Sequence, residues 1–378
     1  MRVALAIRSL EQGGGAEHDV VNLSRGLKKA GHFPLVITAG GRLCQDLRDA
    51  GIDIELLPLT ARGPMSLRRN AIRLADVLER YDIEVVNPQA VFPAVSTCWA
   101  ARRLRRKGRL IPNVVTIHML QRLTGWYYRL GAMTLNRVAE HVIVESQCER
   151  QRLQRHGMRR PVTVLYNCFP AGQIAEVRQT REEIRREMNW PEQAVVFLMP
   201  ARMSTEKSHD VLLRALAQPN VRPLPVLCYL AGEGPTLESV KALAGKLEVA
   251  DKVVFGGFRR DVPRLYKAAD VFLLCSSRES LPLSIREGMA AGLPVLSTDV
   301  GGIVEAVEDG RSGILIPPGD PLALAAAIAR LAGDAVMRRR MGQRGLEIHR
   351  RKFDYGRWIE RTVEVMTQVR QEYMQRMS

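Results

Sequence analysis

The chain has 378 residues, of which 46% are apolar and 25% charged, proportions that suit a globular protein of about two domains. This composition excludes a mostly disordered chain, and no apolar run approaches the roughly 18 residues of a membrane span. Basic residues number 56 against 40 acidic ones, a net charge of +16, and most of the excess lies in the first 170 residues. Such an excess indicates an anionic partner, such as a phospholipid surface, a phosphorylated acceptor or a nucleic acid.

Short apolar runs alternate with stretches of helical periodicity, which predicts repeated βα units and parallel, doubly wound sheets. The first half is expected to hold a helix at 17–30 and strands at 3–7, 34–38, 85–87, 113–117 and 141–144. A charged stretch at 170–192 interrupts the pattern. It restarts with strands at 195–199, 226–231, 252–255, 271–274 and 294–297. Two α/β domains are therefore expected, at 1–170 and 171–355, and an amphipathic helix at about 356–378 either lies on the surface or packs back on the first domain.

A glycine-rich segment at 13–17 follows the first expected strand and opens the first helix. Gly14 and Gly15 would let backbone N–H groups approach a phosphate at the positive end of the helix dipole. It is not the dinucleotide fingerprint, because His18 stands where that motif has its third glycine. The segment fits an anion site and a simple strand-to-helix turn equally well.

Charged residues follow two expected strands of the second domain. Arg202 and Lys207 come after the first, where a planar guanidinium and a compact ammonium suit a diphosphate. Glu279 and Glu287 lie eight residues apart after another, at the sheet edge where doubly wound folds bind ligands. A carboxylate can accept paired hydrogen bonds from the vicinal hydroxyls of a sugar. Alternatively, Arg202 and Lys207 are only solvated basic residues, and the glutamate only stabilises the N-terminus of its helix.

Two weaker signals complete the set. His118 ends the strand at 113–117, which favours a place in a binding cleft, although a lone histidine is more often structural. Residues 299–305 again run from a strand into a glycine pair and a helix, as a second candidate phosphate site.

Together these residues resemble glycosyltransferase family 4, the retaining sugar-nucleotide transferases of the GT-B fold. The resemblance covers nearly the whole chain and is densest at 195–318. Five family elements match in order: the glycine-rich opening at 13–17, a T-x-H element at Thr116 and His118, a G-R-L-x-x-x-K-G element with Arg202 and Lys207 in register, an E-x7-E element at Glu279 and Glu287, and a P-V…G-G-x-x-E element ending at Glu305.

The resemblance implies an α/β fold of two Rossmann-like, doubly wound domains facing each other across a cleft, with the donor bound mainly by the second domain and the acceptor by the first. Four residues would be catalytic: His118, Arg202, Lys207 and Glu279. By the same resemblance, Arg202 and Lys207 would bind the donor diphosphate, and Glu287 would bind the ribose. Glu279 and His118 would contact the transferred sugar. Gly14 and Gly15 would lie at the distal phosphate, and the loop with Phe258 and Arg259 would lie near the nucleotide base.

Two departures from the family pattern, and the lack of a metal-binding motif, refine these expectations. Pro282 stands where the family often has glycine, so phosphate contacts would shift to the amides of Leu283 and Ser284. Arg286 replaces a usually apolar residue, and we expect a solvated side chain or an additional phosphate contact. No strong Asp-x-Asp motif follows a strand, so neither an essential metal nor a cofactor is expected beyond the donor substrate.

The acceptor is suggested by the basic first half. A run of basic residues lies beside Trp99, and aromatic and apolar residues follow His118 at 119–133; the basic residues are Arg102, Arg103, Arg105, Arg106, Lys107 and Arg109. This combination suits an anionic membrane surface, unless the aromatic residues are core. The expected acceptor is a lipid-linked, lipopolysaccharide or exopolysaccharide glycan at the cytoplasmic membrane face.

The expected donor carries UDP and a hexose or N-acetylhexosamine, with GDP-mannose second. Scattered cysteines and the lack of a signal-peptide pattern predict a cytoplasmic protein in peripheral contact with the membrane. Two alternatives stay open: a non-hydrolysing sugar-nucleotide epimerase and a basic nucleic-acid-binding protein. Nucleic acid is not the expected partner, because no aromatic RNA-binding stripe or DNA-reading module is present.

Overall fold

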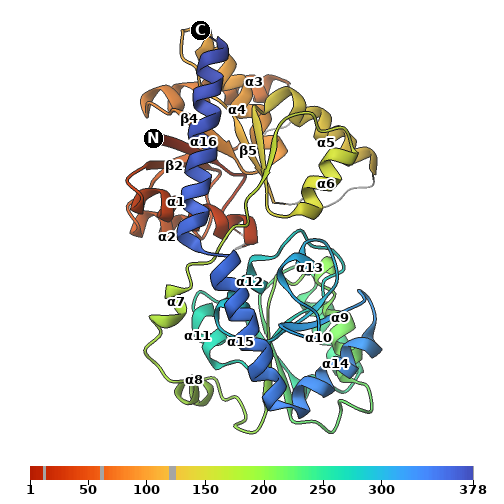
Figure 1. The fold of residues 1–378 in the computed structure, drawn as a ribbon. Coiled ribbons are helices and arrows are strands. Elements are labelled where there is room, and N and C mark those ends of the chain that lie inside the picture. Colours follow the sequence, from red (N-terminus) through yellow and green to blue (C-terminus); the bar gives the residue numbers. More distant parts are fainter. Residues whose placement is uncertain (12–13, 60–63, 119–124, 378) are drawn as a thin grey trace. The chain divides into compact units, whose positions relative to one another are not determined.

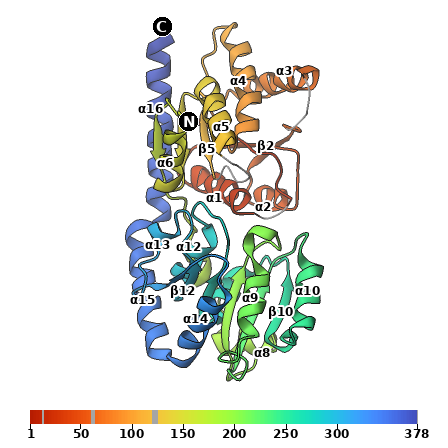
Figure 2. The same ribbon diagram turned by 90° about the vertical axis from the view of Figure 1, so that its right-hand side faces the viewer.

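The computed structural model describes residues 1–11, 14–59, 64–118 and 125–377. They divide into two compact units (Figures 1 and 2). Unit 1 comprises Met1–Cys168 and Tyr355–Ser378, and unit 2 comprises Phe169–Asp354. None of the helices within the described ranges is long and apolar enough to cross a membrane.

Unit 1 is built on parallel strands in two sheets, with the orders β3-β2-β1-β4 and β5-β6-β7. A bridge between Val86 and Asn113 links β4 to the segment that leads into β5. Chain order reverses beside β1, because β2 and β4 pair on either side of it. The strands are β1 Arg2–Ala6, β2 Phe33–Thr38, β3 Asp53–Leu56, β4 Val85–Pro88, β5 Val114–Ile117, β6 His141–Val144 and β7 Val162–Val164.

Seven described helices surround these strands: α1 Gly15–Lys29, α2 Cys44–Asp49, α3 Pro64–Arg80, α4 Val91–Arg105, α5 Gly125–Val138, α6 Gln147–Arg155 and α16 Tyr355–Met377. Gly31 follows α1 with φ +78°, the left-handed conformation that ends helices. The last helix, α16, packs on α1 (Figure 1), and the Tyr355 hydroxyl donates to the carbonyl of Asn22 at 2.6 Å. The end of the chain is therefore part of the first unit.

Unit 2 has one parallel sheet of order β10-β9-β8-β11-β12-β13. Its strands are β8 Val195–Pro200, β9 Val226–Ala231, β10 Val253–Gly257, β11 Val271–Leu274, β12 Val295–Thr298 and β13 Gly313–Ile316. In chain order this is the 3-2-1-4-5-6 arrangement of dinucleotide-binding folds, whose helices lie on both faces of the sheet (Figure 2). The direction of winding reverses between β8 and β11, so the loops after these two strands meet.

The helices of unit 2 are α7 Gly172–Ala175, α8 Arg181–Glu187, α9 His209–Leu216, α10 Leu237–Lys246, α11 Val262–Ala268, α12 Leu283–Ala290, α13 Ile303–Ala306, α14 Pro321–Gly333 and α15 Ala335–Lys352, with 3-10 turns at Thr205–Lys207 and Ala250–Lys252. The charged stretch at 170–192 contains α8. This helix begins with a capping box, in which Thr180 and Glu183 each accept the other's backbone N–H. The two doubly wound units confirm the expected α/β fold class.

Candidate active site

Lys207 and Glu279 meet where the winding of the unit 2 sheet reverses. Lys207 ends the 3-10 turn after β8, and Glu279 lies in the loop between β11 and α12. Lys207 Nζ is 2.6 Å from Glu279 Oε1, and the two side chains are 19% and 7% exposed. A carboxylate this buried requires a cation beside it. The pair therefore fixes an ammonium group at the edge where doubly wound sheets bind ligands.

Neighbouring loops hold this pair in place. The Ser277 amide donates to the Glu206 carbonyl at 2.8 Å, which ties the loop after β11 to the turn that carries Lys207. Gly301 has φ +61°, and a Cβ there would overlap the Glu279 carbonyl. The adjacent Gly302 amide donates to the carbonyl of Ser280. The glycine pair after β12 is thus explained by close packing against the Glu279 loop.

Glu287 lies in the second turn of α12 and accepts a hydrogen bond from the Tyr266 hydroxyl at 2.6 Å. Tyr266, in α11, is fully buried. Burial first, and then the charge of Glu287, raise the pKa of Tyr266 well above its usual value, so the hydroxyl stays a donor. Sequence reasoning missed Tyr266, because no spacing in the chain relates it to Glu287. At the start of α12, Leu283 is buried and Ser284 is partly exposed.

The structure contradicts both expectations for Arg286. Its side chain has no exposed surface, so it neither faces solvent nor offers itself to a phosphate. Its guanidinium donates to the Leu281 carbonyl at 2.7 Å and lies 6.0 Å from the centre of the Phe353 ring. Arg286 therefore links the loop before α12 to the end of α15.

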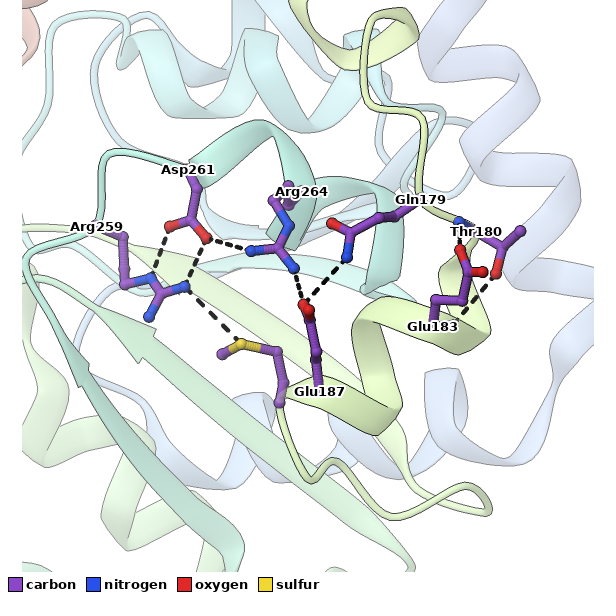
Figure 3. Close-up of polar contacts among 8 residues, drawn as sticks. Gln179, Thr180, Glu183, Glu187, Arg259, Asp261 and Arg264 are labelled. Carbon is purple, nitrogen blue, oxygen red and sulfur yellow. Dashed lines mark hydrogen bonds and ion pairs between the residues drawn. The ribbon is translucent and has the colours of Figure 1, made fainter.

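The guanidinium of Arg259 is engaged with Asp261, through contacts of 2.8 and 2.6 Å (Figure 3). Asp261 also accepts from Arg264, which pairs in turn with Glu187 of α8. The expected contact of Phe258 and Arg259 with the nucleotide base stays a prediction. Arg202 lies partly exposed in the loop between β8 and the turn with Lys207.

In unit 1, His118 directly follows β5 and is surrounded by polar side chains. Its Nδ1 contacts Glu145 Oε1 and lies 3.3 Å from Asp19 Oδ2, and its Nε2 is 2.8 Å from Gln89 Oε1. Burial alone would lower the pKa of His118. The charges and hydrogen bonds of Glu145 and Asp19 outweigh burial and raise this pKa to about 10. The two carboxylates therefore favour the protonated form of His118.

These groups come together because they occupy the carboxyl ends of neighbouring parallel strands. Gln89 follows β4, Glu145 follows β6 and Asn167 follows β7, while Asp19 lies in α1. They line a cavity of about 20 Å³, which has room for one water molecule but not for a sugar ring. Sequence reasoning missed all four partners, although the strand-end rule that singled out His118 could have found Gln89 and Glu145.

Ligand atoms of Asp19, His118 and Glu145 lie within 4.8 Å of one another, the spacing of a possible cation site. The His118 ring and the Glu145 carboxylate nevertheless touch directly, as in a hydrogen bond. A bridging ion would hold these atoms apart, at about 2 Å on either side of it. The geometry therefore fits a shared proton.

The glycine-rich segment opens α1 as expected. Gly14 precedes the helix and accepts from the amides of Glu17 and His18 at 3.0 and 3.1 Å, and Gly15 is the first helical residue. Apart from the adjacent residues and the helix's own backbone, no described atom lies within 4 Å of where a Cβ would stand on either glycine. Among the described residues, nothing blocks an anion from approaching this backbone. Gly13 lies outside the described residues.

Helix α4 exposes a tryptophan and several arginines, and the neighbouring α5 exposes apolar side chains; we call these side chains together the basic–aromatic surface. On α5, Trp126 is 67% exposed, and Leu130 and Met133 follow it on the same helix face. Arg102 of α4 donates to the Arg137 carbonyl at 3.1 Å and so joins the two helices. Its members are Trp99, Arg102, Arg103, Arg105, Arg106, Trp126, Leu130 and Met133. The aromatic residues were expected to be either surface or core; Tyr128 is core, and residues 119–124 lie outside the described ranges.

Two family models match consecutive parts of the chain. The model described as Glycosyltransferase Family 4 matches residues 13–171, and the one described as Glycosyl transferases group 1 matches residues 180–347. Among curated relatives, the putative glycosyltransferase EpsD of Bacillus subtilis is 27% identical over 83% of each chain. The lipopolysaccharide core biosynthesis glycosyltransferase LpsE of Rhizobium meliloti is 29% identical over 68% of this chain and 70% of its own.

Solved structures share the fold. HepE of Anabaena, crystallised with UDP and glucose, superposes with a TM-score of 0.86 at 22% identity, over 97% of this chain and 99% of that one. WaaG, a glycosyltransferase involved in lipopolysaccharide biosynthesis, superposes with a TM-score of 0.75 at 20% identity and the same coverage. The GT-B fold expected from the sequence is thus confirmed.

Proposed function

The chain belongs to glycosyltransferase family 4, and on that basis we propose that it is a retaining transferase that uses a nucleotide-diphosphate sugar. It transfers a hexose or N-acetylhexosamine. The favoured donor is a UDP-sugar, and GDP-mannose is the second candidate. The acceptor is a lipid-linked, lipopolysaccharide or exopolysaccharide glycan at the cytoplasmic face of the membrane. In support, LpsE is named for lipopolysaccharide core biosynthesis, and HepE was solved with UDP and glucose.

The observation that carries the proposal is the Lys207–Glu279 pair at the reversal of the unit 2 sheet. Breaking the bond between the sugar and the diphosphate leaves negative charge on the phosphate oxygens and positive character on the sugar. Lys207 and Arg202 stabilise the departing diphosphate, and Glu279 lies beside the sugar. Because these side chains supply the positive charge themselves, we propose that transfer needs no metal ion.

Further groups of unit 2 suit the nucleotide. Glu287, oriented by Tyr266, accepts hydrogen bonds from the ribose hydroxyls. The amides of Leu283 and Ser284, at the start of α12, meet the diphosphate, since a helix N-terminus favours anions. Phe258 and the backbone beside it contact the base. In unit 1, the amides at Gly14 and Gly15 take the distal phosphate, and His118 faces the transferred sugar.

The basic–aromatic surface supports a membrane-bound acceptor. Exposed tryptophan and aliphatic side chains enter the interface of a bilayer, while neighbouring arginines are attracted to anionic headgroups. Trp99 is 43% exposed beside the arginines of α4, so apolar and basic groups lie next to each other. We propose that the protein binds the membrane peripherally through this surface and meets its acceptor there.

The first experiment is thermal unfolding with UDP, GDP, ADP and dTDP and their common sugar conjugates. A ligand that binds only the folded protein raises the melting temperature by mass action. We expect the largest rise with UDP or a UDP-sugar, and a largest rise with GDP-mannose would select the second donor. Absence of a rise with every nucleotide would contradict the transferase proposal. Formation of a sugar epimer without acceptor would instead identify an epimerase.

A further inference from the structure

Five polar side chains, including His118 itself, are connected in one hydrogen-bonded chain. Four of them follow β4, β5, β6 and β7, and α1 supplies the fifth: Gln89, His118, Glu145, Asn167 and Asp19. All but His118 are nearly fully buried, and His118 itself is 14% exposed. Buried polar groups that satisfy each other in this way define protonation states as well as positions.

The proton on Nε2 of His118 follows from the orientation of two amides. Asn87 donates its NH₂ group to the Val114 carbonyl at 2.6 Å and to the Thr116 hydroxyl at 2.8 Å. Its oxygen therefore accepts from the NH₂ group of Gln89, at 2.5 Å. That leaves the Gln89 oxygen facing His118 Nε2 at 2.8 Å. Because an amide oxygen only accepts, Nε2 must carry a proton.

The proton on Nδ1 follows from the two carboxylates. Asp19 Oδ2 and Glu145 Oε1 both face Nδ1. The Asn167 NH₂ group donates to both carboxylates, at 3.0 Å to Glu145, so their oxygens act as acceptors. Acceptor oxygens facing Nδ1 require a proton on Nδ1 as well. The other described residues that line the adjacent cavity are uncharged, among them Trp358 and Thr362 of α16.

We propose that Asp19 and Glu145 are positioning residues that keep His118 doubly protonated, so that it stays a fixed cation during sugar transfer and exchanges no proton with substrate. The inference rests on the proposed function for the role of His118 beside the sugar. The two carboxylates and the imidazolium together carry one net negative charge, which is complementary to the positive character that develops on the sugar. The raised pKa of His118 agrees with the geometry.

The state of His118 can be measured without any substrate, by NMR titration of protein labelled with ¹³C in its histidines. His118 is assigned by comparison with His118→Asn. We expect its signal to remain that of an imidazolium up to at least pH 9. In Glu145→Gln, which replaces one anion by a neutral amide, we expect the pKa of His118 to fall by more than one unit. A wild-type pKa near or below 7 would overturn the inference whether or not the variant folds.

The transfer reaction supplies the second readout. The wild type should show no loss of kcat/KM from His118 between pH 6 and 9, because the proton stays bound over that range. Glu145→Gln should show an added decline as pH rises, since deprotonation removes the positive charge of His118. Glu55→Gln, on β3 in the same unit, is the control and should keep the wild-type profile. Equal profiles for Glu145→Gln and the wild type would overturn the inference.

Two outcomes distinguish this inference from the proposed function and from a metal-ion site. A high pKa of His118 in a protein that transfers no sugar would contradict the proposed function and leave the protonation state standing. A change of the His118 signal with one equivalent of Zn²⁺ or Mg²⁺, reversed by EDTA, would assign the cluster to a cation and overturn the inference.

Discussion

Lys207 and Glu279 form a close ion pair with little exposed surface. Single and double variants can therefore separate the contribution of the pair to transfer from its contribution to stability. Lys207→Ala removes the ammonium proposed to stabilise the diphosphate and leaves a nearly buried carboxylate without its partner. We expect kcat to fall by roughly 10²- to 10³-fold and the melting temperature to drop. In the double variant Lys207→Met/Glu279→Gln, neutral side chains of similar size should restore the melting temperature but not transfer.

Steady-state kinetics and thermal unfolding measure the two effects independently. Lys241→Ala is the control, because Lys241 is an exposed lysine of α10 whose partner Glu238 lies at 3.0 Å. It should change neither quantity by much, since exposed ion pairs contribute little. Near-normal turnover of Lys207→Ala would remove the pair from the site. Failure of the double variant to regain stability would mean that the pair stabilises the fold for another reason.

Some residues of the candidate site could be predicted from the sequence, and others could not. His118, Arg202 and Glu279 follow strands with continuous apolar runs, so the strand-end rule places them correctly. Asp19, a partner of His118, and Tyr266, the partner of Glu287, carry no local signal, because helix and sheet packing bring them close only after folding. The predictions for Arg286 were wrong for the same reason. A charged side chain in a helix is expected to face solvent unless its buried partners are known.

At the scale of elements, the strands predicted from the sequence are those with a buried apolar run, such as β8 and β9. The strands it missed, β3, β7 and β13, each lie at the edge of their sheet. β3 and β7 are short and nowhere fully buried, so they show neither a continuous apolar run nor a clear core face. In β3 the burial pattern is exposed at both ends and only partly buried between them. β3 and β7 are therefore defined by the sheets they join more than by their own residues.

The packing of α16 on α1 depends on a glycine in the middle of α1. A Cβ on Gly26 would overlap the Ile359 side chain and stand 2.9 Å from the Tyr355 hydroxyl. In an open helix, replacing glycine by alanine stabilises by about 1 kcal/mol. Here we expect Gly26→Ala to destabilise instead, by roughly 1–3 kcal/mol through overpacking. Adding Ile359→Ala should recover part of that loss, as measured by thermal unfolding.

Gly245→Ala is the matched control, because Gly245 lies in α10 and no described atom stands within 4 Å of the place that a Cβ would take there. It should be neutral or stabilising. If Gly26→Ala stabilises to the same extent, the close approach of α16 to α1 is wrong. The contact bears on the site as well, since Trp358 and Thr362 of α16 line the cavity beside His118.

At the scale of the whole molecule, a net charge of +16 could attract the protein to any anionic surface. Salt screens such attraction beyond about 8 Å at physiological ionic strength, so only arginines close to the headgroups contribute strongly. Each one near the surface adds about 1 kcal/mol. Membrane binding through the basic–aromatic surface should therefore depend on where the arginines lie, and not on their total number.

Two variants with equal net charge test this. Changing Arg102, Arg103, Arg105 and Arg106 to glutamine should weaken binding to vesicles with anionic lipid at least tenfold, as measured by co-sedimentation. Changing the exposed Arg339, Arg340, Arg350 and Arg351 of α15 removes the same charge from unit 2 and should have little effect. Equal weakening by both variants would assign the attraction to net charge, and no weakening by the first would remove the membrane from the proposal. Transfer to a water-soluble acceptor should survive the first variant, because we propose that the donor binds mainly to unit 2.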